Sequence, residues 1–205
     1  MTDNSKDEFI EITRIKEEFI ANASHELKTP IASVRLAAES ALTSLERDDG
    51  MTKSFLEQIL RDSDRMNELI SDLLDLSAME SSDVFMEAFD LHDVIANEIS
   101  YLSKQNKKRI SYKKKKVEIN ANFDDISLAV KNLIKNALKY SPPEENILIQ
   151  IEENDKSVRC SFQDFGSGIS KSDQEKIFER FYRVDKGRSR KVGGTGLGLA
   201  IVKHA

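Results

Sequence analysis

Residues 12–45 read ITRIKEEFIANASHELKTPIASVRLAAESALTSL, and this stretch decides the fold of the first part of the chain. Its apolar residues recur every three or four positions, which is the period of one face of a long helix. They are Ile12, Ile15, Phe19, Ala23, Leu27, Val34, Ala38, Ala41 and Leu45. The turn residues Asp48-Asp49-Gly50 then end the pattern.

A second apolar stripe of helical period follows this turn. Its members are Leu56, Ile59, Leu60, Met66, Leu69, Ile70, Leu73 and Leu74. Two long helices joined by a short turn predict an antiparallel hairpin. A lone hairpin leaves much of each stripe in water, whereas two hairpins can cover one another in a four-helix bundle. We therefore expect a homodimer.

His25 lies off the apolar stripe, two residues from Ala23 and therefore about 200° around the helix from it. It is expected to face solvent, and a histidine taken alone is most often a plain surface residue. Its neighbours favour a function, because Glu26 is adjacent and Thr29 lies one turn further on the same face. Pro30 is costly inside a helix and predicts a kink there.

The composition excludes several classes of protein. The 205 residues are 39% apolar, enough for one large or two small domains, and no apolar run reaches the ~18–20 residues that cross a bilayer. We expect no membrane contact by this segment. The single Cys160 excludes an internal disulfide and fits a reducing cytoplasm. A net charge of −5 argues against a nucleic-acid partner.

Charge and glycine are unevenly distributed along the chain. Residues 1–82 hold 9 Lys/Arg against 18 Asp/Glu, whereas residues 83–205 hold 22 against 18. Seven of the eight glycines lie between Gly166 and Gly198. We therefore predict a helical domain over 1–82 and a second domain over 83–205, with the boundary near Ser81-Ser82-Asp83.

The second domain alternates between helices and strands. Asp90 is a predicted cap of a helix, and residues 109–112 and 117–121 read as a β-hairpin around the lysine run 113–116, which is typical of a solvated turn. A helix over about 124–141 and two alternating strands complete the pattern. The fold class is therefore helical hairpin plus α/β sandwich.

Two features of the second domain carry polar chemistry. Asn132, Asn136 and Lys139 form a polar stripe on the helix that Pro142-Pro143 ends. Continuing the alternation of the last strand from Phe162 places Asp164 toward the core, where a carboxylate needs an ion pair or a function.

Glycine-rich segments precede the last helix. Glycines before a helix start expose backbone amides, which favour an anion. No lysine follows Gly193–Gly198 as a P-loop requires, and the Gly-x-Gly-x-Gly spacing does not fit a dinucleotide fingerprint. The glycines alone therefore indicate only an anion site.

Five segments, in this order, resemble the motifs of the catalytic core of two-component sensor histidine kinases. They are Phe19–Pro30 (phosphoacceptor box), Asn132–Ser141 (Asn-box), Asp164–Ile169 (first glycine box), Ile177–Asp185 (phenylalanine box) and Gly193–Ile201 (second glycine box). The resemblance implies a dimeric phosphotransfer hairpin followed by a GHKL-type ATP-binding domain, a mixed sheet with helices on one face.

The resemblance also implies roles for residues of the first domain. His25 would accept the γ-phosphoryl group of ATP, and Glu26 would orient its ring and act as base. The phosphoryl group would pass to an aspartate of a response regulator receiver domain. Thr29 resembles the residue used by kinases that also dephosphorylate their regulator.

In the second domain the resemblance implies a site for ATP and Mg²⁺. Asn136 would bind Mg²⁺, Asn132, Lys139 and Arg183 would approach the phosphates or the metal, and Asp164 would accept from the adenine amino group. Residues 170–192 would form a lid. The cofactor-binding residues are Asn132, Asn136, Lys139, Tyr140, Asp164, Gly166, Gly168, Ile169, Arg183, Gly194, Thr195, Gly196, Leu197 and Gly198.

The sequence departs from the family pattern in two places. Asn122 stands where the family often has an acidic residue, and Ala205 falls inside the last helix, ahead of two further strands that the family usually has. A cytoplasmic location is expected, either as a free chain or as the cytoplasmic part of a membrane-anchored sensor. Two alternatives stay open, a GHKL ATPase acting as a conformational switch and a non-enzymatic dimeric scaffold.

Overall fold

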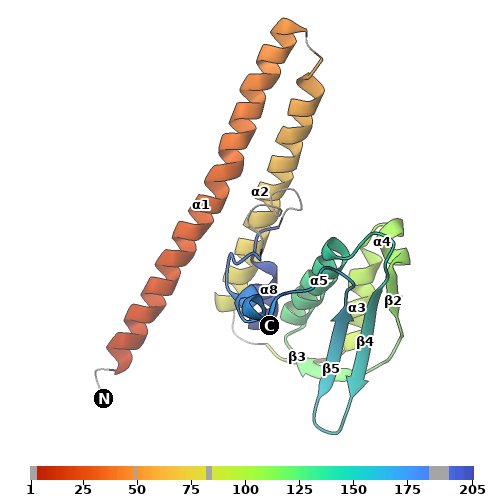
Figure 1. The fold of residues 1–205 in the computed structure, drawn as a ribbon. Coiled ribbons are helices and arrows are strands. Elements are labelled where there is room, and N and C mark those ends of the chain that lie inside the picture. Colours follow the sequence, from red (N-terminus) through yellow and green to blue (C-terminus); the bar gives the residue numbers. More distant parts are fainter. Residues whose placement is uncertain (1–3, 49, 82–84, 185–193) are drawn as a thin grey trace. The chain divides into compact units, whose positions relative to one another are not determined.

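The computed structural model describes residues 4–48, 50–81, 85–184 and 194–205 (Figure 1). The chain forms two compact units, one of residues 1–74 with 193–195 and the other of residues 75–192 with 196–205. The domain boundary is expected near residues 81–83. Two of these residues, 82 and 83, lie outside the described ranges.

The first unit contains α1 (Asn4–Arg47) and most of α2 (Thr52–Ser81), the two long helices of the predicted hairpin. α1 continues as a helix through Pro30 and ends where Asp48 and Gly50 adopt left-handed backbone angles, φ 51° and 73°. The turn predicted at residues 48–50 is therefore confirmed, whereas the kink expected at Pro30 stays a prediction.

Few side chains of the hairpin are buried, and many of its large apolar side chains are exposed. Ala37, Ala41, Ser44 and Leu69 are buried. The exposed set includes Ile20, Ile31, Leu36, Leu42, Leu45, Leu56 and Leu60, each more than half accessible. One hairpin therefore leaves much apolar surface uncovered, as expected.

The second unit alternates helices and strands. In chain order its elements are β1 (Glu87–Asp90), α3 (Leu91–Ser100), α4 (Lys104–Lys108), β2 (Ile110–Tyr112), β3 (Glu118–Ala121), α5 (Phe123–Tyr140), β4 (Ile147–Glu153), β5 (Val158–Gln163), α6 (Lys171–Gln174), a 3₁₀ turn (Lys176–Phe178) and α8 (Gly198–His204). The predicted cap of α3 is confirmed, because the Asp90 carboxylate accepts from the His92 backbone N–H at 2.9 Å.

The strands form two sheets. In the order β2-β4-β5, β2 runs parallel to β4 and β4 antiparallel to β5, while β1 and β3 make a separate antiparallel pair. The predicted hairpin of residues 109–112 with 117–121 is therefore wrong. Instead, Ile110 pairs with Ile147 and Tyr112 with Ile149. This pairing places the apolar side chains of β2 beside the buried isoleucines of β4, which no local pattern encodes.

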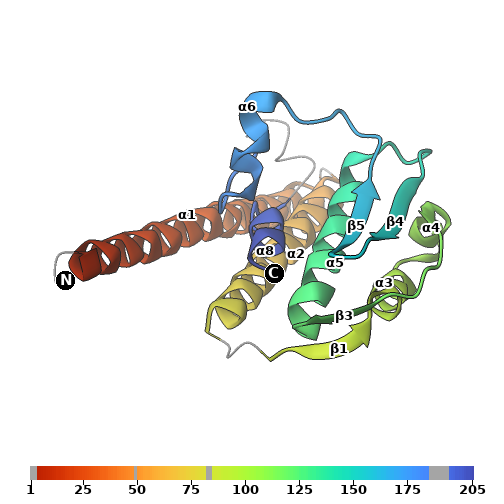
Figure 2. The same cartoon turned by 90° about the horizontal axis from the view of Figure 1, so that it is seen from below.

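The core lies between the three-stranded sheet and helices α3 and α5, which lie side by side (Figure 2). Ile147, Ile149 and Ile151 point from alternate positions of β4 to this core, with 0%, 0% and 7% of their surface accessible. Their helix partners are Val94, Ile95, Val130, Ile134 and Ala137. One face of α5 is thus fixed against the sheet, which positions the polar residues of that helix.

No helix within the described residues is long and apolar enough to cross a bilayer.

Candidate functional site

His25 is exposed on α1, as the helical period predicts. The Thr29 hydroxyl donates to the His25 carbonyl oxygen at 3.4 Å, so the two residues share one face of the helix one turn apart. The ring of His25 is therefore open to a substrate approaching from solvent.

Glu26 is held by a residue that the sequence reasoning missed. Its Oε2 atom lies 3.5 Å from Nη2 of Arg65 on α2, and the two side chains are only 32% and 21% accessible. The ion pair holds the carboxylate of the residue that follows His25 in the sequence. Nothing in the local sequence indicates it, because the approach of residues 26 and 65 depends on the register between the two helices.

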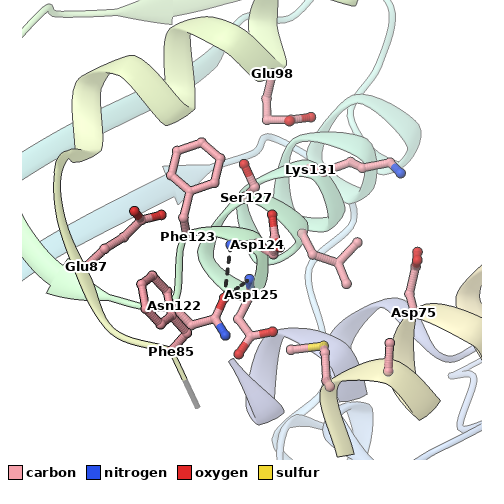
Figure 3. A pocket seen from close by; sticks show the side chains of 13 residues that line it. Asp75, Phe85, Glu87, Glu98, Asn122, Phe123, Asp124, Asp125, Ser127 and Lys131 are labelled. Atoms are coloured by element: carbon pink, nitrogen blue, oxygen red, sulfur yellow. Dashed lines mark hydrogen bonds between the residues drawn. The ribbon is translucent and has the colours of Figure 1, made fainter. Parts of the chain in front are cut away.

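The helix that carries the Asn-box residues begins at a side-chain cap (Figure 3). Oδ1 of Asn122 accepts from the backbone N–H groups of Asp124 and Asp125 at 3.0 and 3.2 Å. An asparagine offers the same kind of oxygen as an acidic residue here, so the departure from the family pattern retains the cap.

A pocket of about 490 Å³ opens beside this cap, and its labelled side chains include Glu87, Glu98 and Lys131 (Figure 3). None of the residues predicted to bind a nucleotide lines it. The predicted nucleotide-binding residues therefore lie outside this pocket.

Asn132, the first residue of the polar stripe of α5, packs against the start of α8. Asn132 is buried, and its Nδ2 donates to the Leu128 carbonyl at 3.0 Å. A Cβ atom added at Gly198 would lie 2.7 Å from Oδ1 of Asn132. The second glycine box thus approaches the Asn-box closely, and only glycine allows this contact. Asn136 is partly buried one turn further along α5.

The C-terminal end of α5 meets the first glycine box. A Cβ atom at Gly166 would lie 2.7 Å from the Tyr140 carbonyl oxygen. Tyr140 itself is 55% accessible, and Nζ of Lys139 lies 5.3 Å from the centre of its ring. Two segments that are distant in sequence therefore converge on one helix.

Asp164 is exposed, and the prediction that it faces the core is wrong. β5 ends at Gln163, so the alternation of a strand no longer applies one residue later. The Asp164 carboxylate instead accepts from the Gly166 backbone N–H at 2.8 Å. This bond orients the carboxylate at the edge of the site.

The segment after the first glycine box is tied to the phenylalanine box. Ser170 Oγ and Tyr182 OH donate to the Asp173 carboxylate at 2.5 and 2.6 Å. These two bonds lower the pKa of Asp173, and the bond to Asp173 raises the pKa of Tyr182. The Phe181 backbone N–H donates to the Gly196 carbonyl at 2.9 Å, which brings the second glycine box to the same place.

The remaining predicted site residues are less closely grouped. Gly168 and Ile169 are exposed and Arg183 is partly buried. Gly194 and Thr195 belong to the first unit, where the Thr195 hydroxyl donates to Asp72 of α2, whereas Gly196, Leu197 and Gly198 belong to the second. Gly193, Asp185 and lid residues 185–192 lie outside the described residues.

Two family models match the chain. The His Kinase A (phospho-acceptor) domain matches residues 15–82, and the histidine kinase-, DNA gyrase B- and HSP90-like ATPase matches residues 121–205. Both segments contain the residues placed above, with His25 in the first and the convergence on α5 in the second.

Curated relatives are similar over nearly the whole chain. The sensor-like histidine kinase SenX3 of Mycolicibacterium smegmatis is 35% identical over 98% of this chain and 53% of its own length. The sensor histidine kinase WalK of Bacillus subtilis is 36% identical over 92% of this chain and 32% of its own length. The chain thus spans about half the length of the first relative and a third of the second.

Solved structures share the fold. The Acinetobacter baumannii histidine kinase AdeS matches 88% of this chain and 84% of its own, with a TM-score of 0.64 and 23% identity. The histidine kinase ThkA, in complex with the response regulator protein TrrA, matches 84% of this chain and 52% of its own, with a TM-score of 0.65 and 21% identity. With its phosphoacceptor and ATPase segments in the family order, this chain belongs to the two-component sensor histidine kinases.

Proposed function

We propose that the chain is the core of an ATP-dependent protein-histidine kinase, which phosphorylates itself on His25 and passes the phosphoryl group to an aspartate of a response regulator. The observation that carries the proposal is the exposed His25 beside a held carboxylate, in one chain with glycine segments that converge on the Asn-box helix. Because ATP is the proposed substrate, the proposal includes a cytoplasmic location for this segment.

The glycine segments that pack around α5, here called the cradle, support a nucleotide site there. At Gly166, Gly196 and Gly198 a Cβ atom would come within 3 Å of other protein atoms, so glycine there lets these segments pack directly against α5 and the phenylalanine box. Asp164 presents a carboxylate that can accept from the adenine amino group, whereas guanine offers an acceptor at that position. The site therefore selects an adenine nucleotide.

Mg²⁺ fits the amide oxygens of the polar stripe. This cation prefers oxygen ligands and keeps several of its ligands from water and substrate phosphates, so one protein oxygen suffices. The Asn136 side chain would supply that oxygen without adding negative charge beside a triphosphate. Among the described residues, no cluster of three or more His, Cys, Asp or Glu side chains offers an alternative metal site. Lys139 and Arg183 would offset charge on the transferred group.

The transfer itself needs a nucleophile and a proton acceptor. A nitrogen lone pair of the neutral His25 ring attacks the γ-phosphorus, a P–N bond forms, and the bond from that phosphorus to the bridging oxygen breaks to release ADP. Glu26 accepts the proton of the other ring nitrogen, and Arg65 holds that carboxylate in place. The P–N bond then breaks as a receiver aspartate takes the phosphoryl group.

The exposed apolar side chains of the hairpin support a homodimer. Eight large residues, from Ile20 to Leu60, are more than half accessible on a single chain, and burying such a surface in a four-helix bundle stabilises the association. The relative ThkA forms a complex with the response regulator TrrA, which supports a receiver domain as the second partner.

Incubation with γ-labelled ATP and Mg²⁺ tests the kinase. Phosphohistidine is acid-labile and base-stable, so such label is expected on the wild type and on His204→Gln, a control at an exposed histidine of α8. It is expected to be absent from His25→Gln and Asn136→Asp. Label on His25→Gln would reassign the acceptor, and ATP hydrolysis without any label would favour a conformational-switch ATPase.

Thr29 is the proposed determinant of a second activity, dephosphorylation of the regulator. Its hydroxyl lies on the exposed face one turn after His25, where it can position a water molecule against a docked phosphoaspartate. Thr29→Ala should leave labelling of His25 intact and slow regulator dephosphorylation. An unchanged dephosphorylation rate would remove this activity from the proposal.

A further inference from the structure

One arginine ties together the end of α5 and the segment that follows it. The Arg109 guanidinium lies between α4 and β2 in the chain and donates to four backbone carbonyls. Nη1 reaches Leu138 at 3.2 Å, Nη2 reaches Ser141 at 3.3 Å and Pro142 at 2.8 Å, and Nε reaches Glu145 at 3.2 Å. All four acceptors belong to the last turn of α5 or to the loop toward β4.

This arrangement suits the chemistry of a helix end. The last carbonyls of a helix lack partners within it and carry partial negative charge, so a cation with several donors stabilises them. The fork of a guanidinium can serve four acceptors at once, which a lysine ammonium with three donors cannot. The backbone of Arg109 is itself anchored, because its carbonyl accepts from the Ile147 N–H at 2.7 Å at the start of β4.

Ser141 carries the constraint onward to the first glycine box. This residue is only 5% accessible, and its Oγ accepts from the Phe165 backbone N–H at 3.0 Å. Phe165 lies between Asp164 and Gly166, and Gly166 packs against the Tyr140 carbonyl. A shift at the end of α5 would therefore shift the Asp164 carboxylate.

We propose that Arg109 and Ser141 are positioning residues for adenine recognition. They hold the end of α5 and the Asp164 segment together, and so keep the adenine acceptor at a constant distance from the phosphate and metal residues of the same helix. Neither residue touches the nucleotide in this scheme, and both act through Asp164. The inference rests on the proposed function, since it deepens the assignment of Asp164.

The experiment compares two nucleotides in each variant. Dissociation constants of Mg-ADP and Mg-GDP are measured by calorimetry for the wild type, Ser141→Ala and Arg109→Lys, beside thermal unfolding of each chain. The preference for ADP over GDP should fall about tenfold in Ser141→Ala, the size expected for one lost buried hydrogen bond, with GDP affinity little changed. Arg109→Lys should also lower the preference for ADP over GDP.

Matched controls come from the exposed positions of β5. Ser161→Ala and Arg159→Lys make the same chemical changes at exposed residues outside the hydrogen bonds of Arg109 and Ser141, and both should retain the wild-type preference. A role in folding alone would lower the unfolding temperature and weaken both nucleotides equally, leaving their ratio unchanged.

The outcomes separate the two levels of the argument. A wild type that binds ADP in preference to GDP, with the preference intact in both variants, overturns the positioning role and leaves the kinase proposal standing. If a variant loses affinity for ADP and for GDP by the same factor, the positioning role is likewise overturned, and a role in folding replaces it. A wild type that binds neither nucleotide overturns the proposed function, and this inference with it.

Discussion

Replacing Gly166 by alanine tests the cradle around α5 most directly. The added Cβ atom would lie 2.7 Å from the Tyr140 carbonyl oxygen and 3.0 Å from Oδ1 of Asp164. Ordinary contacts begin near 3.4 Å, so the glycine segment and the helix end must separate by about 0.7 Å. Gly166 does not have a positive φ, so the effect comes from the collision and not from backbone strain.

The size of the effect follows from the cost of overpacking. Forcing one extra carbon into a packed position typically costs ~1–3 kcal/mol. If this cost falls on the arrangement that binds nucleotide, affinity for Mg-ADP drops roughly 5- to 150-fold, since ~1.4 kcal/mol corresponds to tenfold. The Asp164 carboxylate is one of the atoms that must move, so adenine recognition should suffer most.

Calorimetric titration with Mg-ADP measures the loss of nucleotide affinity, and thermal unfolding measures the loss of stability. Gly50→Ala is the control, because its Cβ would meet nothing within 4 Å although its φ is +73°. That variant should lose about 1 kcal/mol of stability from backbone strain and keep its ADP affinity. A folded Gly166→Ala chain that binds ADP within about twofold of the wild type would refute the argument for a steric cradle.

Three further outcomes are expected. Arg65→Gln should slow labelling of His25 roughly two- to fivefold and leave ADP affinity unchanged, because a part-buried ion pair is worth ~0.5–1 kcal/mol. Equal labelling rates in the variant and the wild type would show that Glu26 does not need Arg65. Asn122→Ala should destabilise the second unit by about 1 kcal/mol in thermal unfolding, whereas Asn122→Asp should preserve the cap of α5. Equal unfolding temperatures for the two variants would contradict the capping role. Burial raises the pKa of Cys160 to about 11, so the folded thiol should resist iodoacetamide at pH 8 and react on unfolding. Rapid alkylation of the folded chain would disprove this protection. The raised pKa also means that the folded state holds the thiol proton more tightly than the unfolded state, so the free energy of unfolding should fall as the pH rises from 9 toward 11.

The hairpin and its exposed histidine could be predicted from the sequence because both depend on periodicity within one helix. The off-stripe position of His25, the end of α1 at residues 48–50 and the cap of α3 at Asp90 are properties of neighbouring residues, and the structure confirms all three. The polar stripe of α5 is of the same kind.

Strand pairing and the orientation of Asp164 were predicted wrongly for one reason. Each prediction extended a local pattern past the point where tertiary packing takes over. Two strands that are neighbours in sequence and separated by a lysine run look like a hairpin. However, β2 lies parallel to β4 instead, where its apolar side chains pack beside buried isoleucines. The alternation of β5 stops at Gln163, and Asp164 turns outward to bind the Gly166 N–H.

Contacts between distant residues were decided by the tertiary structure alone. Arg65 reaches Glu26 only because the helices of the hairpin have a particular register, and Arg109 reaches the end of α5 only because β2 lies beside β4. The periodic sequence determined which faces of the helices are apolar and which carry His25 and Asn136. Which elements lie side by side depends on the total apolar surface that each arrangement buries, a sum over the whole domain that no single stretch of sequence contains.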